Sequence, residues 1–164
     1  MFLVNSRAII ERVEKGALEI VVQTRNKPGE PQQIELPGGR IEPFESLPAA
    51  LIREVQEETG LEVVEIEGAD TRVDTVGMEE NFEVECIKPF AAYQTIKGSF
   101  DSVGVYFRCK AQGELLSSGD ETKNPRWVAV NELRRRMEED PLHFSPVDRA
   151  GILFYLKVLQ QERG

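Results

Sequence analysis

Apolar positions divide the chain into short strands on either side of one central helix. Before the helix, the expected strands cover residues 2–14, 17–24 and 34–36, and Lys15-Gly16 marks the turn of a hairpin between the first two. After the helix, apolar or alternating segments predict strands at residues 61–66, 81–87, 90–96, 103–109 and 126–130. Strands that precede and follow the helix are therefore available to pair in one sheet.

Two more helices are expected near the end of the chain, at residues 130–139 and 147–161. Asn131 is the expected cap of the first, and Asp148 suits the positive end of the second helix's dipole. Together with the strands, these helices predict an α/β layered architecture, in which a mixed sheet is covered by helices. No repeat or linker divides the sequence, so residues 1–164 are expected to form a single domain.

The central helix is predicted over residues 47–59 from the signals at its two ends. Ser46 is a good N-cap, because its hydroxyl can accept a hydrogen bond from a free N–H of the first turn. Pro48 lies early enough in the helix that its missing N–H costs nothing. Gly60 follows the last residue, where glycine adopts the left-handed conformation without strain.

Three glutamates of this helix lie together beside its apolar stripe. At about 100° per residue, Leu51 and Val55 face one way, and Glu54, Glu57 and Glu58 share an arc of roughly 100° that flanks them. A purely solvated acidic face is expected opposite the core, where like charges repel least. Carboxylates crowded at the edge of a buried face favour a divalent cation, since Mg²⁺ is bound by a few carboxylates, substrate phosphates and water.

The stretch around this helix resembles the Nudix box of the MutT-type Nudix hydrolases. The residues that match its fixed positions, with the same spacing, are Gly39, Glu45, Arg53-Glu54-Val55, Glu57-Glu58 and Gly60-Leu61. Chance agreement at all of them is on the order of 10⁻¹⁰ for each starting position. The resemblance implies a Nudix α/β/α sandwich with a catalytic loop–helix–loop motif. It also implies a metal-dependent pyrophosphohydrolase, in which metal-activated water attacks a phosphorus of a substrate linked to a nucleoside diphosphate.

The resemblance also implies roles for the residues of the box. Glu57 and Glu58 are expected as the principal ligands of Mg²⁺ or Mn²⁺, and the carbonyl of Gly38 as a backbone ligand. Glu54 is expected as either a further ligand or the base that orients the attacking water. The charge run alone is typical of a solvated surface, and only the full spacing makes metal binding the better interpretation.

The loop before the helix is expected to bind both the helix and the substrate. Arg53 is expected to be one of the catalytic residues, and its expected role is to hold Glu45 and the loop in place. Gly39 and Arg40 are the candidate substrate-binding residues, because a glycine lets phosphates approach the backbone closely.

A further metal ligand is expected from a loop that follows the sheet. Glu121 is the best candidate, because it lies six residues before Trp127, an acid-then-tryptophan pattern that resembles the family's. Asp120 and Glu114 are alternatives, and an ordinary solvated acidic loop remains open as an interpretation.

Residues outside the box leave the substrate open. Arg7 and Arg126 are candidates for phosphate contacts, although isolated arginines are more often surface ion pairs. The only histidine, His143, is in a loop and is more often a bystander there than a catalyst. Several aromatic residues are candidates for stacking on a base, although most aromatics in strands belong to the core: Phe82, Phe90, Tyr93, Phe100 and Phe144.

Composition excludes some partners and predicts a location. The net charge of −9 disfavours binding to a nucleic-acid polymer or an anionic membrane, but not to a small nucleotide that brings its own metal ions. Without a signal peptide or a membrane-spanning run, the protein is expected in the cytoplasm. Cys86 and Cys109 are expected as buried free thiols. A homodimer and a nucleotide-binding module without catalysis both stay open.

Overall fold

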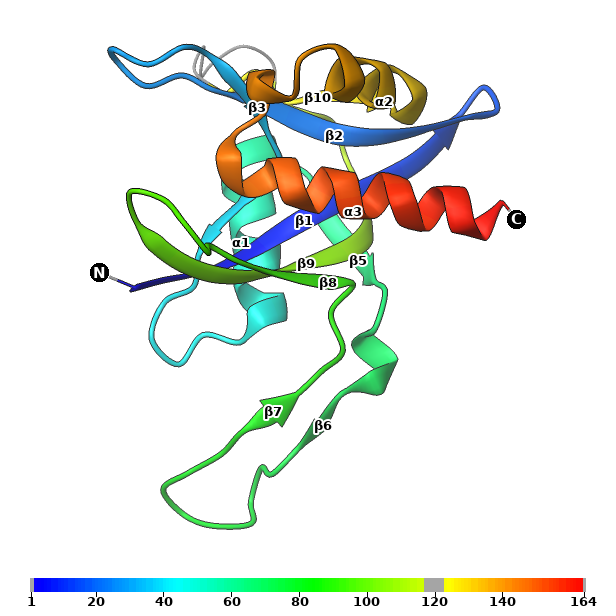
Figure 1. Ribbon diagram of the computed structural model, residues 1–164. Helices are drawn as coiled ribbons and strands as arrows, with labels where there is room; N and C mark the ends of the chain where they lie inside the picture. The colour runs from blue at the N-terminus through cyan, green and yellow to red at the C-terminus, as the bar shows by residue number, and fades with distance from the viewer. Residues whose placement is uncertain (1, 117–122, 164) are drawn as a thin grey trace.

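A mixed sheet of eight strands runs through the middle of the protein (Figure 1). The computed structural model describes residues 2–116 and 123–163. The main path of the sheet is β10 (Arg126–Ala129), β2 (Ala17–Arg25), β1 (Phe2–Glu14), β9 (Asp101–Gln112) and β5 (Glu62–Ile66). Off this path, β3 (Gln33–Glu35) pairs with β2, β4 (Gly38–Arg40) with β1 and β8 (Ala91–Gln94) with β9. The pair β1–β9 is parallel, and the other pairs in this sheet are antiparallel.

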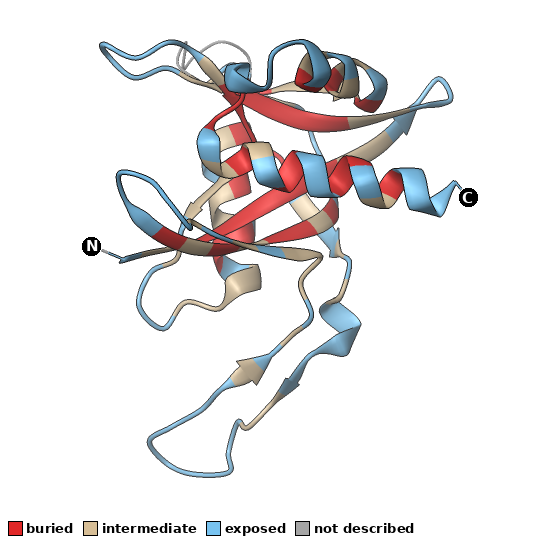
Figure 2. Ribbon diagram, in the orientation of Figure 1, coloured by how far each residue is buried: buried red, intermediate tan, exposed pale blue. Residues whose placement is uncertain are grey.

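Helices cover both faces of the sheet and bury its apolar side chains. Helix α1 (Leu47–Thr59) lies on one face, and α2 (Val130–Glu139) and α3 (Pro146–Glu162) lie on the other. Neighbouring side chains of β1 point to opposite faces, so Ile9 packs in the core with α2 and α3, while Ala8 and Ile10 pack in the core with α1. Figure 2 shows the buried residues along the middle of the sheet and on the helix faces that contact it. This architecture confirms the predicted mixed sheet covered by helices.

Helix α1 begins and ends where the sequence predicts. The Ser46 side chain accepts a hydrogen bond of 3.1 Å from the Ala49 N–H, and Gly60 follows the helix with φ +79°. Leu51 and Val55 are fully buried, which places the acidic residues of the helix at the edge of the core. The helix is therefore fixed at both ends and along one face before any ligand is considered.

Two predictions about the bounds of helices and strands are wrong. The cap of α2 is Ala129 and not Asn131, because the helix starts at Val130 directly after β10, which places Asn131 inside its first turn. The strand expected over residues 81–87 contains only β7 (Glu85–Cys86), which pairs with β6 (Val73–Asp74).

The two cysteines have different surroundings. Both are free thiols, as expected, but Cys86 is exposed and only Cys109 is buried. The prediction for Cys86 is wrong because β7 lies in an arm, residues 68–88, that extends away from the sheet. Burial raises the pKa of the Cys109 thiol to about 12. Among the described residues, no helix is both long and apolar enough to cross a membrane.

Candidate active site

Two consecutive glycines, Gly38 and Gly39, begin the short strand β4 and bring the start of the box, here called the glycine loop, against β1 and α1. A Cβ atom at Gly38 would lie 2.5 Å from the Ser6 carbonyl oxygen, and Gly38 has φ +143°. A Cβ at Gly39 would lie 2.9 Å from the carboxylate carbon of Glu54. A side chain at Gly38 would displace the backbone of β1, and one at Gly39 would push the Glu54 carboxylate out of its place. The backbone of this loop therefore lies directly against a carboxylate of α1.

Arg53 connects the loop to the helix, as predicted. Its Nε and Nη2 donate to the two carboxylate oxygens of Glu45, both at 2.8 Å, and Nη1 donates to Glu54 Oε1 at 2.9 Å. Nη2 also donates to the Arg40 carbonyl oxygen at 3.3 Å. Such a bidentate pair fixes the orientation of the guanidinium and the carboxylate as well as the distance between them. The guanidinium thus positions the loop and one of the three acidic side chains.

The Arg53–Glu45 pair predicts a pH-dependent contribution to stability. The hydrogen bond from Arg53, followed by the one from the Glu42 N–H, lowers the pKa of Glu45 from 4.5 to about 2. Ionised Glu45 therefore stabilises the fold above about pH 4.5, and this contribution is lost as the pH falls toward 2. We expect Glu45→Gln to lower the free energy of unfolding at pH 7 and to match the wild type near pH 2, measured by urea unfolding.

The exposed Glu138 on α2 provides the matched control for this titration. Glu138→Gln removes the same charge and should change stability little at either pH. A stability gap for Glu45→Gln that stays constant between pH 7 and pH 2 would contradict the assigned ion pair.

Glu58 is bound on several sides by groups from other elements. Its Oε1 accepts from the Gly38 N–H at 2.9 Å, and its Oε2 accepts from Gln23 Nε2 at 2.6 Å. Lys123 Nζ lies 3.2 Å from Glu58 Oε2 and 3.3 Å from Glu35 Oε1. Burial disfavours the charged lysine, but the two carboxylates outweigh this and raise the pKa of Lys123. Lys123 therefore carries a positive charge beside the expected metal ligand.

Sequence reasoning missed Gln23, Glu35 and Lys123. Gln23 is fully buried and bridges the two carboxylates, since its Nε2 also donates to Glu35 Oε1 at 3.0 Å. Its Oε1 is the one buried side-chain oxygen or nitrogen without a hydrogen bond among the described residues. Two sequence features could have indicated these residues: Gln23 is polar within the apolar strand β2, and Glu35 is an acid just before Leu36-Pro37. Neither indicates its partner across the sheet.

Glu54 and Glu57 have contrasting environments. Burial raises the pKa of Glu54, the hydrogen bond from Arg53 acts in the opposite direction, and the neighbouring carboxylates raise the pKa further. The Glu57 side chain is 59% exposed, and its Oε2 lies 3.5 Å from Arg53 Nη1. Within residues 2–116 and 123–163, no three acidic, histidine or cysteine side chains converge as a metal site.

The donor set nevertheless fits Mg²⁺ or Mn²⁺. Carboxylate oxygens from neighbouring turns of α1 lie beside the backbone of a glycine loop, and such hard oxygen donors suit these ions. Glu121 and Asp120 lie outside the described residues. Glu114 is exposed, and its carbonyl oxygen would lie 3.4 Å from a Cβ at Gly60, at the C-terminal end of α1.

A cavity of about 570 Å³ adjoins the glycine loop. Arg40, a candidate substrate-binding residue, lines it, and so does Phe100, alone among the five aromatic candidates. Arg25 and Lys27 add positive charge, and Glu35 connects the cavity to the Glu58 network. The cavity thus joins cationic groups, one aromatic ring and the edge of the box.

Arg7 also lines this cavity, but it is not a surface residue. It is buried in an ion pair with the fully buried Asp148, with Nε 2.7 Å from Oδ1 and Nη2 3.0 Å from Oδ2. Asp148 also accepts from the Leu36 N–H at 2.8 Å, just before the box. The structure thus gives Asp148 a buried partner in addition to its expected place at the start of the helix.

The other candidates lie away from the box. Phe144 is fully buried in the core, Phe90 packs against Phe154 and Tyr155, and Phe82 is exposed on the arm. Arg126 donates to the Thr24 hydroxyl and to the Asn124 carbonyl. His143 is exposed in the short helix η2 (Pro141–His143) and does not line the cavity. These placements leave the cavity and the α1 carboxylates as the candidate site.

Comparisons with known proteins agree with this geometry. The sequence matches the NUDIX domain family over residues 2–148, so the chain belongs to the Nudix family. The protein is accordingly a hydrolase that acts on pyrophosphate bonds. A comparison with curated protein sequences finds no match.

Several solved structures share the fold. A MutT NUDIX hydrolase from Burkholderia pseudomallei is 18% identical, with a TM-score of 0.57 over 80% of this chain and 85% of that one. The NUDIX domain of Shewanella oneidensis NrtR, in complex with ADP ribose, is 16% identical, with a TM-score of 0.64 over 97% and 89%. A C. elegans Ap4A hydrolase is 14% identical, with a TM-score of 0.59 over 97% and 98%.

Proposed function

We propose that this protein is a Mg²⁺- or Mn²⁺-dependent pyrophosphohydrolase of a small nucleotide-like substrate. The observation that carries the proposal is the set of α1 carboxylates: Glu54 and Glu58 lie against the glycine loop, Glu57 lies on the neighbouring turn, and Gln23 links Glu58 to Glu35 in the wall of the cavity. Glu57, Glu58 and the Gly38 carbonyl would hold the metal, with Glu121 as a further ligand. When bound, the metal would polarise the phosphoryl oxygens and lower the pKa of a water molecule.

The chain's own residues would orient the reactants. Glu54, whose pKa is raised by burial, is suited to accept a proton from the attacking water or to serve as a further ligand. Arg53 would keep Glu54 and the loop in place through its bonds to both carboxylates. Gly39 would let a phosphate approach the backbone, and Arg40 would contact the substrate from the wall of the cavity.

The cavity and two structural relatives support the substrate class that we propose. One of them binds ADP ribose and another is an Ap4A hydrolase, and both ligands contain nucleoside diphosphate units. Positive groups at Arg25, Lys27 and Arg40, with the ring of Phe100, would suit such a ligand. We propose a single functional domain over residues 1–164 and a cytoplasmic location.

Lys123 is expected to compete with the metal for Glu58. Its ammonium lies 3.2 Å from Glu58 Oε2. A metal ion bound by Glu58 would therefore be repelled by the positive charge of Lys123. We expect Lys123→Met to bind Mn²⁺ about tenfold more tightly, because one unit charge at a few ångströms is worth about 1–4 kcal/mol. The Mn²⁺ affinity is measured by electron paramagnetic resonance of the free ion. Weaker Mn²⁺ binding by the variant would instead assign Lys123 to positioning Glu58.

The alternative is a nucleotide-binding module that does not hydrolyse its ligand. The complete box argues against it, since all three α1 glutamates and Arg53 are present. A panel of nucleoside triphosphates, diphosphate sugars and dinucleotides, assayed with and without Mg²⁺ or Mn²⁺, separates the two functions. Hydrolysis supports the enzyme, and tight nucleotide binding without turnover supports the module.

A further inference from the structure

Gln23 is a polar side chain buried inside an apolar strand. It follows Ile20, Val21 and Val22 on β2, and like them it is fully buried. Burying an amide is unfavourable unless its donors and its acceptor are paired, and Gln23 Oε1 has no hydrogen bond among the described residues. An apolar side chain of the same size would fill this position without an unpaired oxygen. What distinguishes Gln23 from such a residue is its Nε2 group.

The Gln23 amide divides its two hydrogens between two carboxylates. Nε2 donates to Glu58 Oε2 at 2.6 Å and to Glu35 Oε1 at 3.0 Å. The amide nitrogen only donates and the amide oxygen only accepts, so the reverse orientation would place the oxygen against two carboxylate oxygens. The two carboxylates thus fix the orientation of the amide, and the amide fixes where the carboxylates lie relative to each other.

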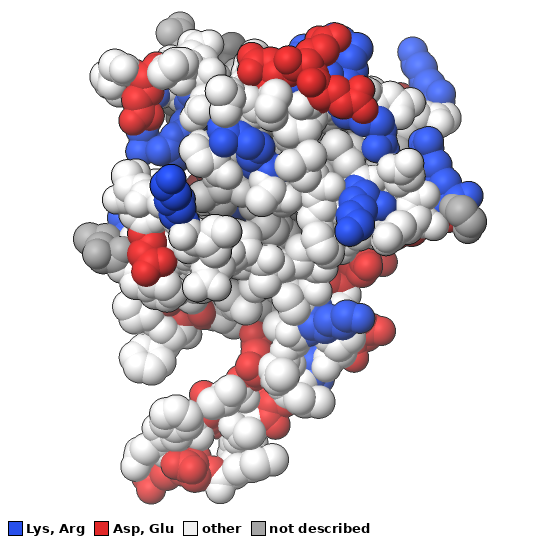
Figure 3. Space-filling model, viewed as in Figure 1, with Lys and Arg blue, Asp and Glu red and all other residues white. Residues whose placement is uncertain are grey.

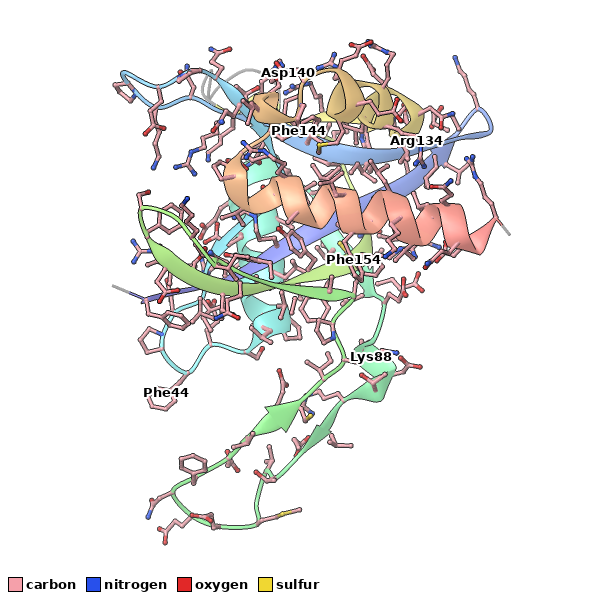
Figure 4. All side chains as sticks on the ribbon, in the orientation of Figure 1. Phe44, Lys88, Arg134, Asp140, Phe144 and Phe154 are labelled. Carbon is pink, nitrogen blue, oxygen red and sulfur yellow. The ribbon has the colours of Figure 1, made fainter. Side chains whose placement is uncertain are left out.

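Glu35 is the anchored end of this chain of contacts. It lies opposite Gln23 in the β2–β3 pair, and the neighbouring Ile34 forms a bridge with Phe144, which lies on the segment between α2 and α3 (Figure 4). Figure 3 shows basic side chains between the β2–β3 loop and the β8–β9 turn, two segments that line the cavity. Three cations lie near the Glu35 carboxylate: Lys123 at 3.3 Å, Arg7 at 3.8 Å and Arg25 at 3.9 Å.

Glu58 is the end that faces the chemistry. Each of its oxygens accepts from one neutral donor, Oε1 from the Gly38 N–H at 2.9 Å and Oε2 from Gln23. A carboxylate oxygen has two lone pairs, so a donor on one of them leaves the other for a cation. Neutral donors of this kind orient a metal-binding carboxylate without repelling the ion. Lys123 also lies near Oε2, but its charge opposes a metal ion, so the bond from Gln23 is the one compatible with a bound cation.

We propose that Gln23 is a positioning residue of the hydrolase, which holds the Glu58 carboxylate in the geometry that binds the metal, with Glu35 as its anchor. The inference rests on the proposed function, because it concerns the ion that Glu58 would bind. Gln23 does not line the cavity and acts only through Glu58. Its loss should therefore change metal affinity and kcat and leave the KM of the substrate nearly unchanged.

Gln23→Met tests this role, because methionine is unbranched, has nearly the length of glutamine and cannot donate. We expect Mn²⁺ binding, measured by electron paramagnetic resonance of the free ion, to weaken at least tenfold. We expect kcat to fall about 10–100-fold, with KM changed less than about threefold. The Tm of the metal-free protein should change little, because the unpaired oxygen disappears together with the two hydrogen bonds. Thr24→Val is the matched control, since the hydroxyl of this next residue on β2 accepts from Arg126.

A second substitution shows whether Gln23 acts through Glu58. In a Glu58→Gln background, Gln23→Met should have little further effect on Mn²⁺ affinity, because the carboxylate that it positions is absent. In a Glu57→Gln background, Gln23→Met should still weaken Mn²⁺ binding about tenfold, because Glu58 remains. A general disturbance of the fold would instead act equally in both backgrounds.

The wild-type protein offers a measurement that does not depend on the folding of a variant. Titration with Mg²⁺ should shift the side-chain amide resonances of Gln23 in NMR spectra, because the ion would share the Glu58 carboxylate with this amide. Gln112 is the internal control, since its Nε2 donates to Glu62 at 3.0 Å, outside the candidate site. The side-chain amide resonances of Gln112 should not move.

Three results would overturn the role of Gln23 while the wild type still binds Mn²⁺ and hydrolyses its substrate. One is a Gln23→Met protein with unchanged Mn²⁺ affinity and kcat. Another is a loss of the same size in the Glu58→Gln and Glu57→Gln backgrounds. The third is a Gln23 amide that Mg²⁺ does not shift. A wild-type protein that neither binds Mn²⁺ nor hydrolyses any substrate would overturn the proposed function as well.

Discussion

Glu57→Gln is expected to lower hydrolysis about 10³-fold and to leave the fold intact. The carboxylate is one of the two principal expected metal ligands, and loss of metal-based charge stabilisation of several kcal/mol corresponds to this factor. The side chain is 59% exposed, so the neutral amide of the same size should not disturb the packing of α1. The measurement pairs kcat on the best substrate with the Tm of the metal-free protein.

Glu65 on β5 provides the control for this variant. It is 68% exposed and carries the same charge, so Glu65→Gln should retain the activity of the wild type. If Glu57→Gln kept more than about a tenth of the wild-type kcat, Glu57 would not be a principal ligand.

Asp148→Asn is expected to destabilise the fold by about 3 kcal/mol. The substitution leaves the buried Arg7 guanidinium without its main counter-charge, and breaking a buried ion pair in this way costs about 3–5 kcal/mol. We expect the lower end of this range of free energies, because Glu35 lies 3.8 Å from Arg7 and compensates part of the guanidinium's charge. A loss of this size is a large fraction of the stability of an ordinary domain, and urea unfolding measures it.

A double variant separates the buried charge from the packing. Arg7→Met with Asp148→Asn removes both charges and keeps an oxygen that can accept from the Leu36 N–H. It should be more stable than Asp148→Asn alone, because no uncompensated charge remains. Equal stability of the single and double variants would show that the ion pair is not what Asp148 contributes.

Local signals explain why the box could be predicted from sequence. Ser46, Pro48 and Gly60 define the ends of α1 through the chemistry of their own positions. The spacing of Glu54, Glu57 and Glu58 along the helix fixes their place beside the apolar stripe. The contact between Arg53 and Glu45 spans only eight residues, and it was expected from the family resemblance.

Contacts between distant residues could not be predicted in this way. Gln23 and Glu58 are 35 residues apart, and Arg7 and Asp148 are 141 residues apart. A polar residue inside a strand indicates a buried partner but not which one, because the partner depends on the order of the strands. The alternation of polar and apolar side chains over residues 81–87 is likewise compatible with any strand. It does not indicate that this segment lies in an arm that leaves the sheet.

Hydrolysis with metal titration in ¹⁸O-labelled water tests the proposed function most directly. The wild-type protein should cleave a nucleotide-like diphosphate only when Mg²⁺ or Mn²⁺ is present, and one labelled oxygen should enter a phosphate product. EDTA should abolish the reaction, and added metal should restore it. Tight binding of the nucleotides without cleavage, at any metal concentration and across the whole panel, would contradict the proposed function.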